Sequence, residues 1–161
     1  MPKDGKDEVN GVRMSSRNKS DLIDSWMSIT NLQTQINNSI EAELQNKHDL
    51  SLKEFFVLYL LAQTEDKKLR LQELQEWVGL SQSAISRLVG RLEAKNCRTL
   101  QRDVCENDRR GIYTCLTPSG EVKFQESLAT VETLLRDNLS KEQLLQELNS
   151  IAKTIKHSYD T

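Results

Sequence analysis

The chain has 161 residues, the size of one domain, and 37% of them are apolar. No apolar run approaches the roughly 18 residues of a membrane span, and the charged N-terminus lacks the apolar stretch of a secretory signal, so we expect a cytoplasmic protein. The net charge of −2, taken for the whole chain, argues against a nucleic-acid binder, and an odd count of three cysteines argues against a disulfide scaffold.

The chain begins with two contrasting segments. Residues 1–19 are polar and lack periodicity, so we expect a flexible N-terminal arm. Residues 20–47 carry apolar side chains at helical spacing, which predicts one helix about 40 Å long. These side chains are Leu22, Trp26, Ile29, Ile36, Ile40 and Leu44.

A second helix is predicted directly after the first. Ser51 and Glu54 have the spacing of a capping box, in which each side chain accepts a hydrogen bond from the other residue's backbone N–H. The apolar residues that follow favour a largely buried helix, and the polar residues 63–70 favour a charged connection. The expected buried residues are Phe55, Phe56, Leu58, Tyr59 and Leu61.

Two short helices joined by a tight turn are predicted next. Residues 71–78 favour a helix with Leu74, Trp77 and Val78 facing inward, and Gly79 ends it. Ser81 is a suitable N-cap for a further helix from residue 82 to about 95. This arrangement is typical of a helix-turn-helix.

The second of these helices has one apolar and one polar face. At 100° per residue, Ile85, Leu88, Val89 and Leu92 share one face. The opposite face carries Ser83, Ser86, Arg87, Gly90 and Arg91, with no acidic residue among them.

The last third of the chain predicts a hairpin followed by helices. Residues 97–104 and 111–116 alternate like strands and flank a polar loop, which indicates an antiparallel hairpin. Thr117 and Pro118 have the N-cap and first-turn chemistry of a helix start. Ser140 and Gln143 form a second capping box, which predicts a final helix with an apolar stripe.

Positive charge is concentrated in the middle of the chain. Residues 67–113 contain ten basic and six acidic residues, although the chain as a whole is negative. A local basic region on an acidic chain favours binding to a polyanion.

The element order and two motifs resemble the MarR family of bacterial winged-helix regulators. The motifs are "VGLSQSAISRLVGRLE" and "RDVCENDRRGIYTCLTPSG", the latter holding Asp108-Arg109-Arg110. The resemblance implies a mainly α fold with a small β-hairpin wing: a winged helix-turn-helix with N- and C-terminal dimerisation helices. It divides the chain into the arm at 1–19, an N-terminal dimerisation helix at 20–47, a DNA-binding lobe at 48–117 and C-terminal dimerisation helices at 118–161.

The resemblance assigns DNA-binding roles to two groups of residues. The recognition helix at about 82–95 would enter the major groove, and the wing at about 98–116 would enter the minor groove. Asp108 would steady the wing. The expected DNA-binding residues are Ser81, Gln82, Ser83, Ser86, Arg87, Arg91, Arg109 and Arg110.

Other kinds of site have little support in the sequence. We find no nucleophile motif and no phosphate-binding glycine loop, so we expect no enzyme and no cofactor. His48 and His157 lack partners at metal-ligand spacing, so we expect no metal. The aromatic residues Trp26, Phe55, Phe56 and Tyr59 are candidates either for a ligand pocket between the first two helices and the lobe or for plain core and dimer packing.

The sequence therefore predicts a homodimeric regulator that binds a pseudo-palindromic double-stranded DNA site. A repressor released by a small molecule or a stress signal is the leading hypothesis. Two alternatives remain at this point. One is a winged-helix module for protein–protein contact, and the other is a cysteine-based redox sensor, for which Cys105 in the polar loop is the first candidate.

Overall fold

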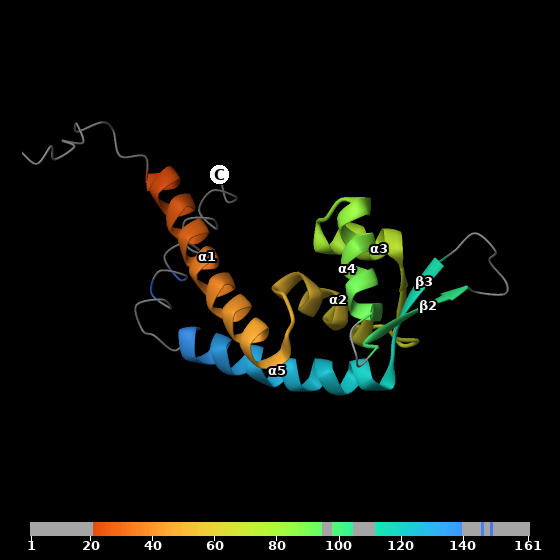
Figure 1. Ribbon diagram of the computed structural model, residues 1–161. Coiled ribbons are helices and arrows are strands. Elements are labelled where there is room, and N and C mark those ends of the chain that lie inside the picture. Colours follow the sequence, from red (N-terminus) through yellow and green to blue (C-terminus); the bar gives the residue numbers. More distant parts are fainter. Residues whose placement is uncertain (1–20, 95–97, 105–111, 140–145, 147–148, 150–161) are drawn as a thin grey trace, which may run out of the picture.

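The computed structural model of the chain describes residues 21–94, 98–104, 112–139, 146 and 149. Within these residues the elements follow the order α1, α2, β1, α3, α4, β2, β3, α5 (Figure 1). The expectation of a mainly helical chain with a small antiparallel β unit is confirmed. In the described part of the chain, no helix is both long and apolar enough to cross a membrane.

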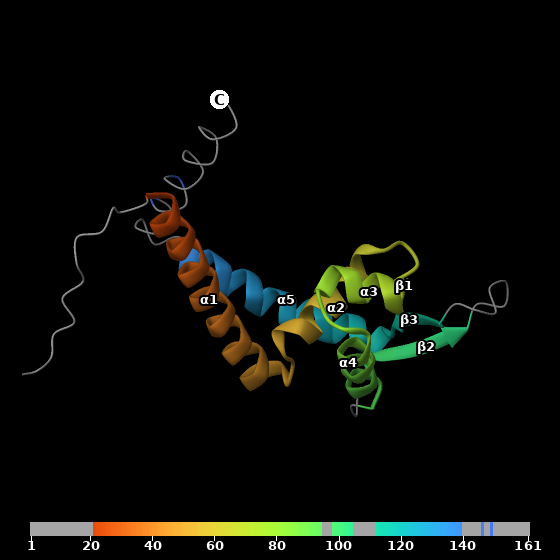
Figure 2. The same cartoon turned by 90° about the horizontal axis from the view of Figure 1, so that it is seen from above.

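Helix α1, Asp21–His48, is the long helix that the periodicity predicts. Its C-terminal half contributes Ile40 and Leu44 to the core, whereas Trp26, near its start, is 64% exposed. Figures 1 and 2 show α1 crossing α5 and running away from the rest of the molecule toward its N-terminus. The expected arm at 1–19 lies outside the described residues.

Helix α2, Leu52–Gln63, begins at the predicted capping box. The Ser51 hydroxyl accepts a hydrogen bond from the Glu54 N–H at 3.1 Å, and the Glu54 carboxylate accepts one from the Ser51 N–H at 2.9 Å. The expectation that the whole apolar run is buried needs correction: Phe56 is 37% and Tyr59 42% exposed. The reason is geometric, because the seven apolar residues 55–61 surround the helix and only one side of it meets the core.

The charged connection expected at 63–70 is wrong in part, because it contains a strand. β1, Lys68–Arg70, pairs antiparallel with β3, Ile112–Leu116, and β2, Leu100–Val104, pairs with the other edge of β3. Three residues are too few to show strand alternation in a sequence. The sheet order is β1-β3-β2, so the predicted hairpin gains a third strand.

Helices α3, Leu71–Val78, and α4, Gln82–Ala94, form the predicted helix-turn-helix. Leu74 and Val78 are buried, but the inward orientation expected for Trp77 is wrong, since this side chain is 76% exposed. Leu74 and Val78 lie four residues apart and make a narrow stripe. Trp77 is rotated by about 100° from Val78 and therefore lies beside that stripe.

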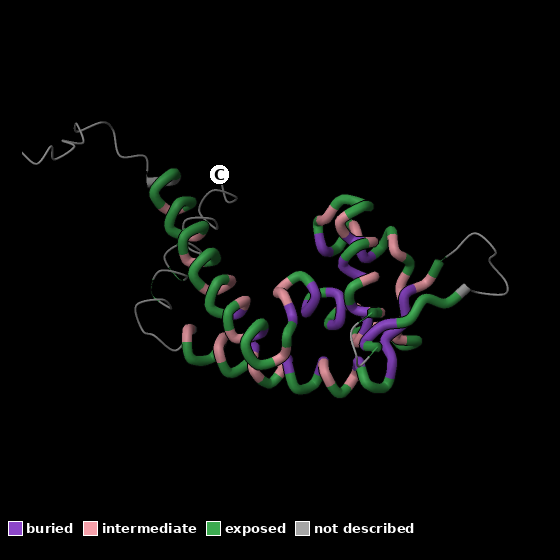
Figure 3. The backbone as a smooth tube through the Cα atoms, in the orientation of Figure 1, coloured by how far each residue is buried: buried purple, intermediate pink, exposed green. Residues whose placement is uncertain are grey.

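Helix α5, Pro118–Leu139, begins as predicted, with the Thr117 hydroxyl accepting a hydrogen bond from the Gly120 N–H at 3.0 Å. Phe124 and Val131 join the core. The core extends from the C-terminal half of α1 through α2 and the helix-turn-helix to the sheet, as the buried segments in Figure 3 show. The second capping box and the helix predicted after it fall outside the described residues, apart from positions 146 and 149.

Candidate nucleic-acid interface

The turn between α3 and α4 is built from a glycine and a serine. Gly79 adopts a left-handed conformation with φ of 67°, which lets its N–H donate to the Gln75 carbonyl at 3.0 Å. The Ser81 hydroxyl then accepts a hydrogen bond from the Ala84 N–H at 3.3 Å. These two caps end one helix and begin the next within three residues, and so fix the angle between them.

The two faces of α4 divide as the sequence predicts. Ile85, Leu88, Val89 and Leu92 are buried. On the other face Gly90 borders open space, because a Cβ added there would meet nothing within 4 Å. Five of the six expected DNA-binding residues at this helix are exposed and one, Ser86, is half-buried: Ser81, Gln82, Ser83, Ser86, Arg87 and Arg91.

The two arginines of this face differ in their surroundings. Arg87 takes no polar partner among the described residues, whereas the Nε atom of Arg91 lies 3.3 Å from the Glu54 carboxylate. Glu54 belongs to α2 and its side chain is only 4% exposed. The sequence places no acid on the α4 face itself, so this contact, made across 37 residues, could not be predicted.

The strands show which parts of the expected wing the structure describes. Arg98 lies before β2 rather than on it, and its carbonyl accepts a hydrogen bond from the Thr117 hydroxyl at 2.7 Å. Arg102, on β2, pairs with Glu93 of α4 at 3.1 Å. Cys105, Asp108, Arg109 and Arg110 lie outside the described residues, so their expected roles stay predictions.

Strand β1 brings two cationic side chains to the sheet that sequence reasoning did not place there. Arg70 donates from Nε to the Tyr113 hydroxyl at 3.1 Å, and its guanidinium lies 5.4 Å from the centre of the Tyr113 ring. Lys68 lies 5.8 Å from the same centre, which brings two cations to the base of the hairpin. The signal in the sequence was the basic cluster at residues 67–70.

A cleft of about 460 Å³ lies between α3, the start of α4 and the sheet. Its wall includes amide side chains from both helices and one guanidinium. The residues around it are Arg70, Leu71, Gln72, Gln75, Glu76, Gln82 and Ile112. Gln82 therefore lies both in this cleft and at the start of the expected recognition helix.

Three of the four aromatic residues proposed for a ligand pocket come together. Phe55 packs on Phe56, Tyr59 and Phe124 with ring centres 6.1–6.4 Å apart, which joins α2 to α5. Trp26 lies in the half of α1 that runs away from α2 and is 64% exposed (Figure 1). None of the four lines the cleft beside α3 and α4. None of them lines the cleft between α1 and α5, described next, either. The cluster around Phe55 accounts for three of them as packing.

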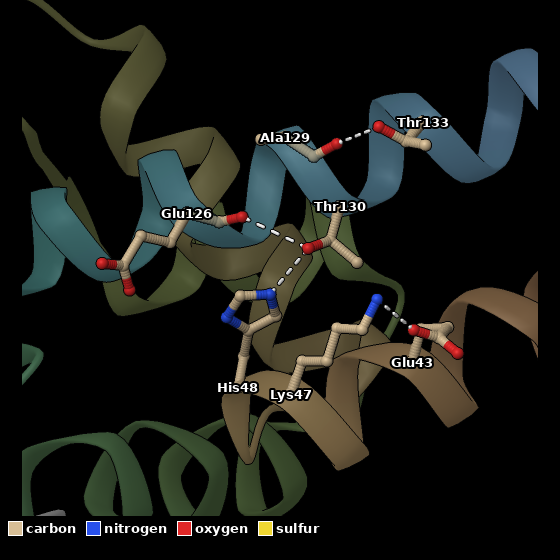
Figure 4. A network of polar contacts seen from close by, with 7 residues as sticks. All are labelled: Glu43, Lys47, His48, Glu126, Ala129, Thr130 and Thr133. Atoms are coloured by element: carbon tan, nitrogen blue, oxygen red, sulfur yellow. Dashed lines mark hydrogen bonds and ion pairs between the residues drawn. The ribbon is translucent and has the colours of Figure 1, made fainter.

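A second cleft, of about 600 Å³, lies where the end of α1 meets the start of α5. In it the His48 ring contacts the Thr130 hydroxyl at 2.8 Å, and Thr130 in turn donates to the Glu126 carbonyl (Figure 4). Burial lowers the pKa of His48, with Lys123 and Lys47 acting in the same direction and Glu126 opposing them. The contact between His48 and Thr130 joins α1 to α5. The described residues hold no cluster of three or more potential metal ligands.

Cys115 is the one cysteine that the structure describes, and it is buried on β3. Burial raises the pKa of its thiol, as does nearby Asp103, so the reactive thiolate is disfavoured. The surroundings of Cys115 are those of a small buried apolar residue. Cys97 and Cys105 lie outside the described residues.

Comparisons with known proteins agree with this geometry. A family model described as "Transcriptional regulator SarA/Rot" matches residues 39–127. The HTH-type transcriptional repressor MdtR of Bacillus subtilis is 32% identical over 114 residues, which cover 69% of this chain and 71% of that protein.

Solved structures share the fold. AbsC, a MarR family transcriptional regulator from Streptomyces coelicolor, superposes with a TM-score of 0.70 and 23% identity over 90% of this chain and 99% of its own. A second MarR family regulator from that organism, solved in complex with DNA, gives a TM-score of 0.67 and 21% identity over 83% and 84% of the two chains. These two likenesses establish the arrangement of helices and strands.

Proposed function

The chain belongs to the SarA/Rot family of transcriptional regulators and is of the MarR type, and from this premise we propose that it binds double-stranded DNA as a homodimer and represses transcription. It is a regulator and not an enzyme. The cytoplasm, where bacterial DNA lies, is its proposed location. The observation that carries the proposal is the exposed polar face of α4, because no apolar contact of the fold needs those side chains.

The start of α4 is the proposed reader of bases. Ser81, Gln82 and Ser83 are exposed at the first turn, where the side chains of a recognition helix reach base edges in the major groove. Hydroxyl and amide groups can donate to and accept from those edges, and serine side chains are short enough for close approach.

The later turns of α4 are the proposed phosphate contacts. Arg87 and Arg91 lie one turn apart and Ser86 lies beside them, so a phosphate strand that passes along this face meets both cations. The proposal places Arg109 in the adjacent minor groove and Arg110 among the DNA-binding residues, with Asp108 steadying the wing.

Dimer formation follows from the exposed apolar residues of α1. Ile23, Trp26 and Met27 are 51–64% exposed, and a second copy related by two-fold symmetry would cover them. Two-fold symmetry places two recognition helices about 34 Å apart, which requires inverted half-sites separated by about 10 base pairs.

Repression is the finer part of the proposal. A dimer bound across a promoter blocks access to it, and the related MdtR is named a repressor. The dimer would be released from DNA if a small molecule or a stress signal favoured a different separation of the two recognition helices.

A salt titration of DNA binding tests the proposal. Duplexes of 30 base pairs would be selected by the protein from a random library and compared with scrambled duplexes of the same composition by fluorescence anisotropy. We expect tighter binding to the selected duplex and a steep fall of log K with log salt concentration. A protein-contact module would bind neither duplex, and that result would contradict the proposal.

Sedimentation of the same protein tests the homodimer. We expect a dimer at micromolar concentration and one dimer on each selected duplex. A monomer in both measurements would contradict the two-fold part of the proposal and leave DNA binding itself standing.

A further inference from the structure

Glu54 is a charged residue in an apolar setting. It lies in the first turn of α2, its residue exposure is 3%, and its neighbours Phe55, Val57 and Leu58 belong to the core. Burial of a carboxylate is costly unless its oxygen atoms are bonded. One oxygen accepts the Ser51 N–H at 2.9 Å, and the other lies 3.3 Å from Nε of Arg91. The capping box uses the first of these oxygens, and the second contacts Arg91 of α4.

Arg91 is bound on one side and open on the other. Its Nε atom faces Glu54, and its side chain is nevertheless 59% exposed. Among the described residues no other polar group bonds to it, so both terminal nitrogens of the guanidinium remain available. A guanidinium carries five donors in one plane, and fixing Nε also fixes the direction in which the remaining four point.

The N-terminus of α2 is itself held by two neighbouring helices. The Leu52 N–H donates to the Glu41 carboxylate of α1, and the Lys53 ammonium donates to the Val78 carbonyl at the end of α3, 2.8 Å away. Glu54 therefore lies in a turn that is fastened to α1 on one side and to the helix-turn-helix on the other. A carboxylate fixed in this way is a rigid support for a flexible arginine.

Arg87 provides the comparison within the same helix. It lies one turn before Arg91 on the same face and has no polar partner among the described residues. A free arginine loses rotamer entropy when it is immobilised. Arg91 has already lost much of that freedom through Glu54, so immobilisation on DNA costs it less.

We propose that Glu54 is a positioning residue for DNA binding: it holds the Nε side of Arg91 and directs the free edge of that guanidinium at a phosphate of the bound duplex. This inference rests on the proposed function and adds a role for a residue on α2, which does not itself face the DNA. It also supplies a direct connection from α2 to the recognition helix, through one ion pair.

A double-mutant cycle on DNA affinity tests the inference. Glu54→Gln keeps the shape and one acceptor oxygen of the side chain while removing its charge. We expect this change to weaken binding to the selected 30-base-pair duplex about fivefold in the parent, the size of one weakened charged hydrogen bond. In an Arg91→Ala background the same change has no further effect, because the arginine that it positions is absent.

Arg87 is the matched control for this cycle. Glu54→Gln in an Arg87→Ala background should weaken binding by the same factor as in the parent, because the two residues are independent. Equal effects of Glu54→Gln in the parent, Arg87→Ala and Arg91→Ala backgrounds would overturn the inference and leave Glu54 with a purely structural role. Tighter binding by Glu54→Gln would also overturn it.

A measurement without DNA separates this inference from the proposed function. In ¹⁵N-edited spectra the Arg91 Nε–Hε signal should be sharp and slow to exchange in the parent protein and should broaden in Glu54→Gln, while the Arg87 signal stays the same. An Arg91 signal as labile as that of Arg87 in the parent would overturn the positioning. Failure of the parent to bind any duplex would instead overturn the proposed function, and with it the DNA-facing half of the inference.

Discussion

The two halves of α1 lie in very different surroundings although they form one continuous helix. The C-terminal half buries Ile40 and Leu44 among α2 and the rest of the core, and its last residue, His48, contacts α5. The N-terminal half carries Trp26, 64% exposed, and Met27, 51% exposed. Figure 3 shows this change from buried to exposed along the helix.

The difference teaches that periodicity alone does not say what an apolar stripe will meet. Both halves of α1 show apolar residues at helical spacing. Among the described residues, only the C-terminal half contributes buried side chains to the core, those of Ile40 and Leu44. The N-terminal half has the exposed apolar surface that the proposed dimer would cover.

The largest effect is expected from a charge placed on the exposed half. Trp26→Glu would put a carboxylate into the proposed dimer interface, and burial of an unpaired charge costs several kcal/mol. We expect a monomer in sedimentation at micromolar concentration. Affinity for a duplex with two half-sites should fall about a hundredfold or more, because the second contact is no longer linked to the first.

Trp77→Glu is the control for that experiment. Trp77 is an equally large and still more exposed residue, but it lies on α3 rather than α1. We expect its substitution to leave the dimer intact in sedimentation. A monomer of Trp77→Glu or a stable dimer of Trp26→Glu would contradict the placement of the dimer interface on the N-terminal half of α1.

The next effect concerns the stability of the core. Leu58 is fully buried on α2, so Leu58→Ala should lower the free energy of unfolding by about 2–5 kcal/mol. Ile23→Ala, on the exposed half of α1, should change it by about 0.5 kcal/mol or less when both are measured in the monomeric Trp26→Glu background. Urea denaturation followed by circular dichroism measures both. Similar losses at the two sites would mean that the exposed half is part of the same core.

Two glycines, Gly120 at the start of α5 and Gly90 on α4, compare a tightly packed backbone with an open one. A Cβ at Gly120 would collide with the Thr99 carbonyl, so Gly120→Ala should lower the free energy of unfolding by about 1–3 kcal/mol. A Cβ at Gly90 meets open space within a helix, so Gly90→Ala should raise it by about 0.5–1 kcal/mol. Thermal denaturation of the two variants should therefore move the melting temperature in opposite directions. A shift of the same sign in both would contradict the close approach at Gly120.

The smallest effect is a pH dependence at the C-terminal end of α1, where His48 contacts α5. Burial lowers the pKa of His48 below its value in the unfolded chain, so the folded state binds fewer protons in that range. The resulting stability is present above about pH 6.5 and is lost as pH falls through the lower folded-state pKa. His48→Gln keeps a polar partner for Thr130 without titrating. We expect the melting temperature of the parent to fall slightly more than that of this variant between pH 7.5 and 5.5. Equal falls would contradict a lowered pKa of His48 in the folded state.

The helix boundaries and the two faces of α4 could be predicted because they depend on local chemistry. Ser51, Gly79, Ser81 and Thr117 mark helix boundaries through hydrogen bonds to residues within four positions along the chain. The faces of α4 follow from its 3.6-residue period. Such interactions are visible in sequence because the partners are neighbours.

Other features were missed because they depend on residues far apart in sequence. Trp77 was expected inside, since its apolar character carries no information on which elements pack beside α3. Strand β1 is defined by pairing with β3, more than 40 residues later. The Phe55 cluster likewise depends on Phe124 of α5.

By itself, the sequence determined the order of helices, their capped ends and the polar face of the proposed recognition helix, because each depends on spacing and on short-range hydrogen bonds. Tertiary structure alone decided that Glu54 meets Arg91, that α1 is buried in one half and exposed in the other, and that a third strand completes the sheet. These contacts join residues that are far apart along the chain, and their spacing in the sequence does not show that they lie close together in space.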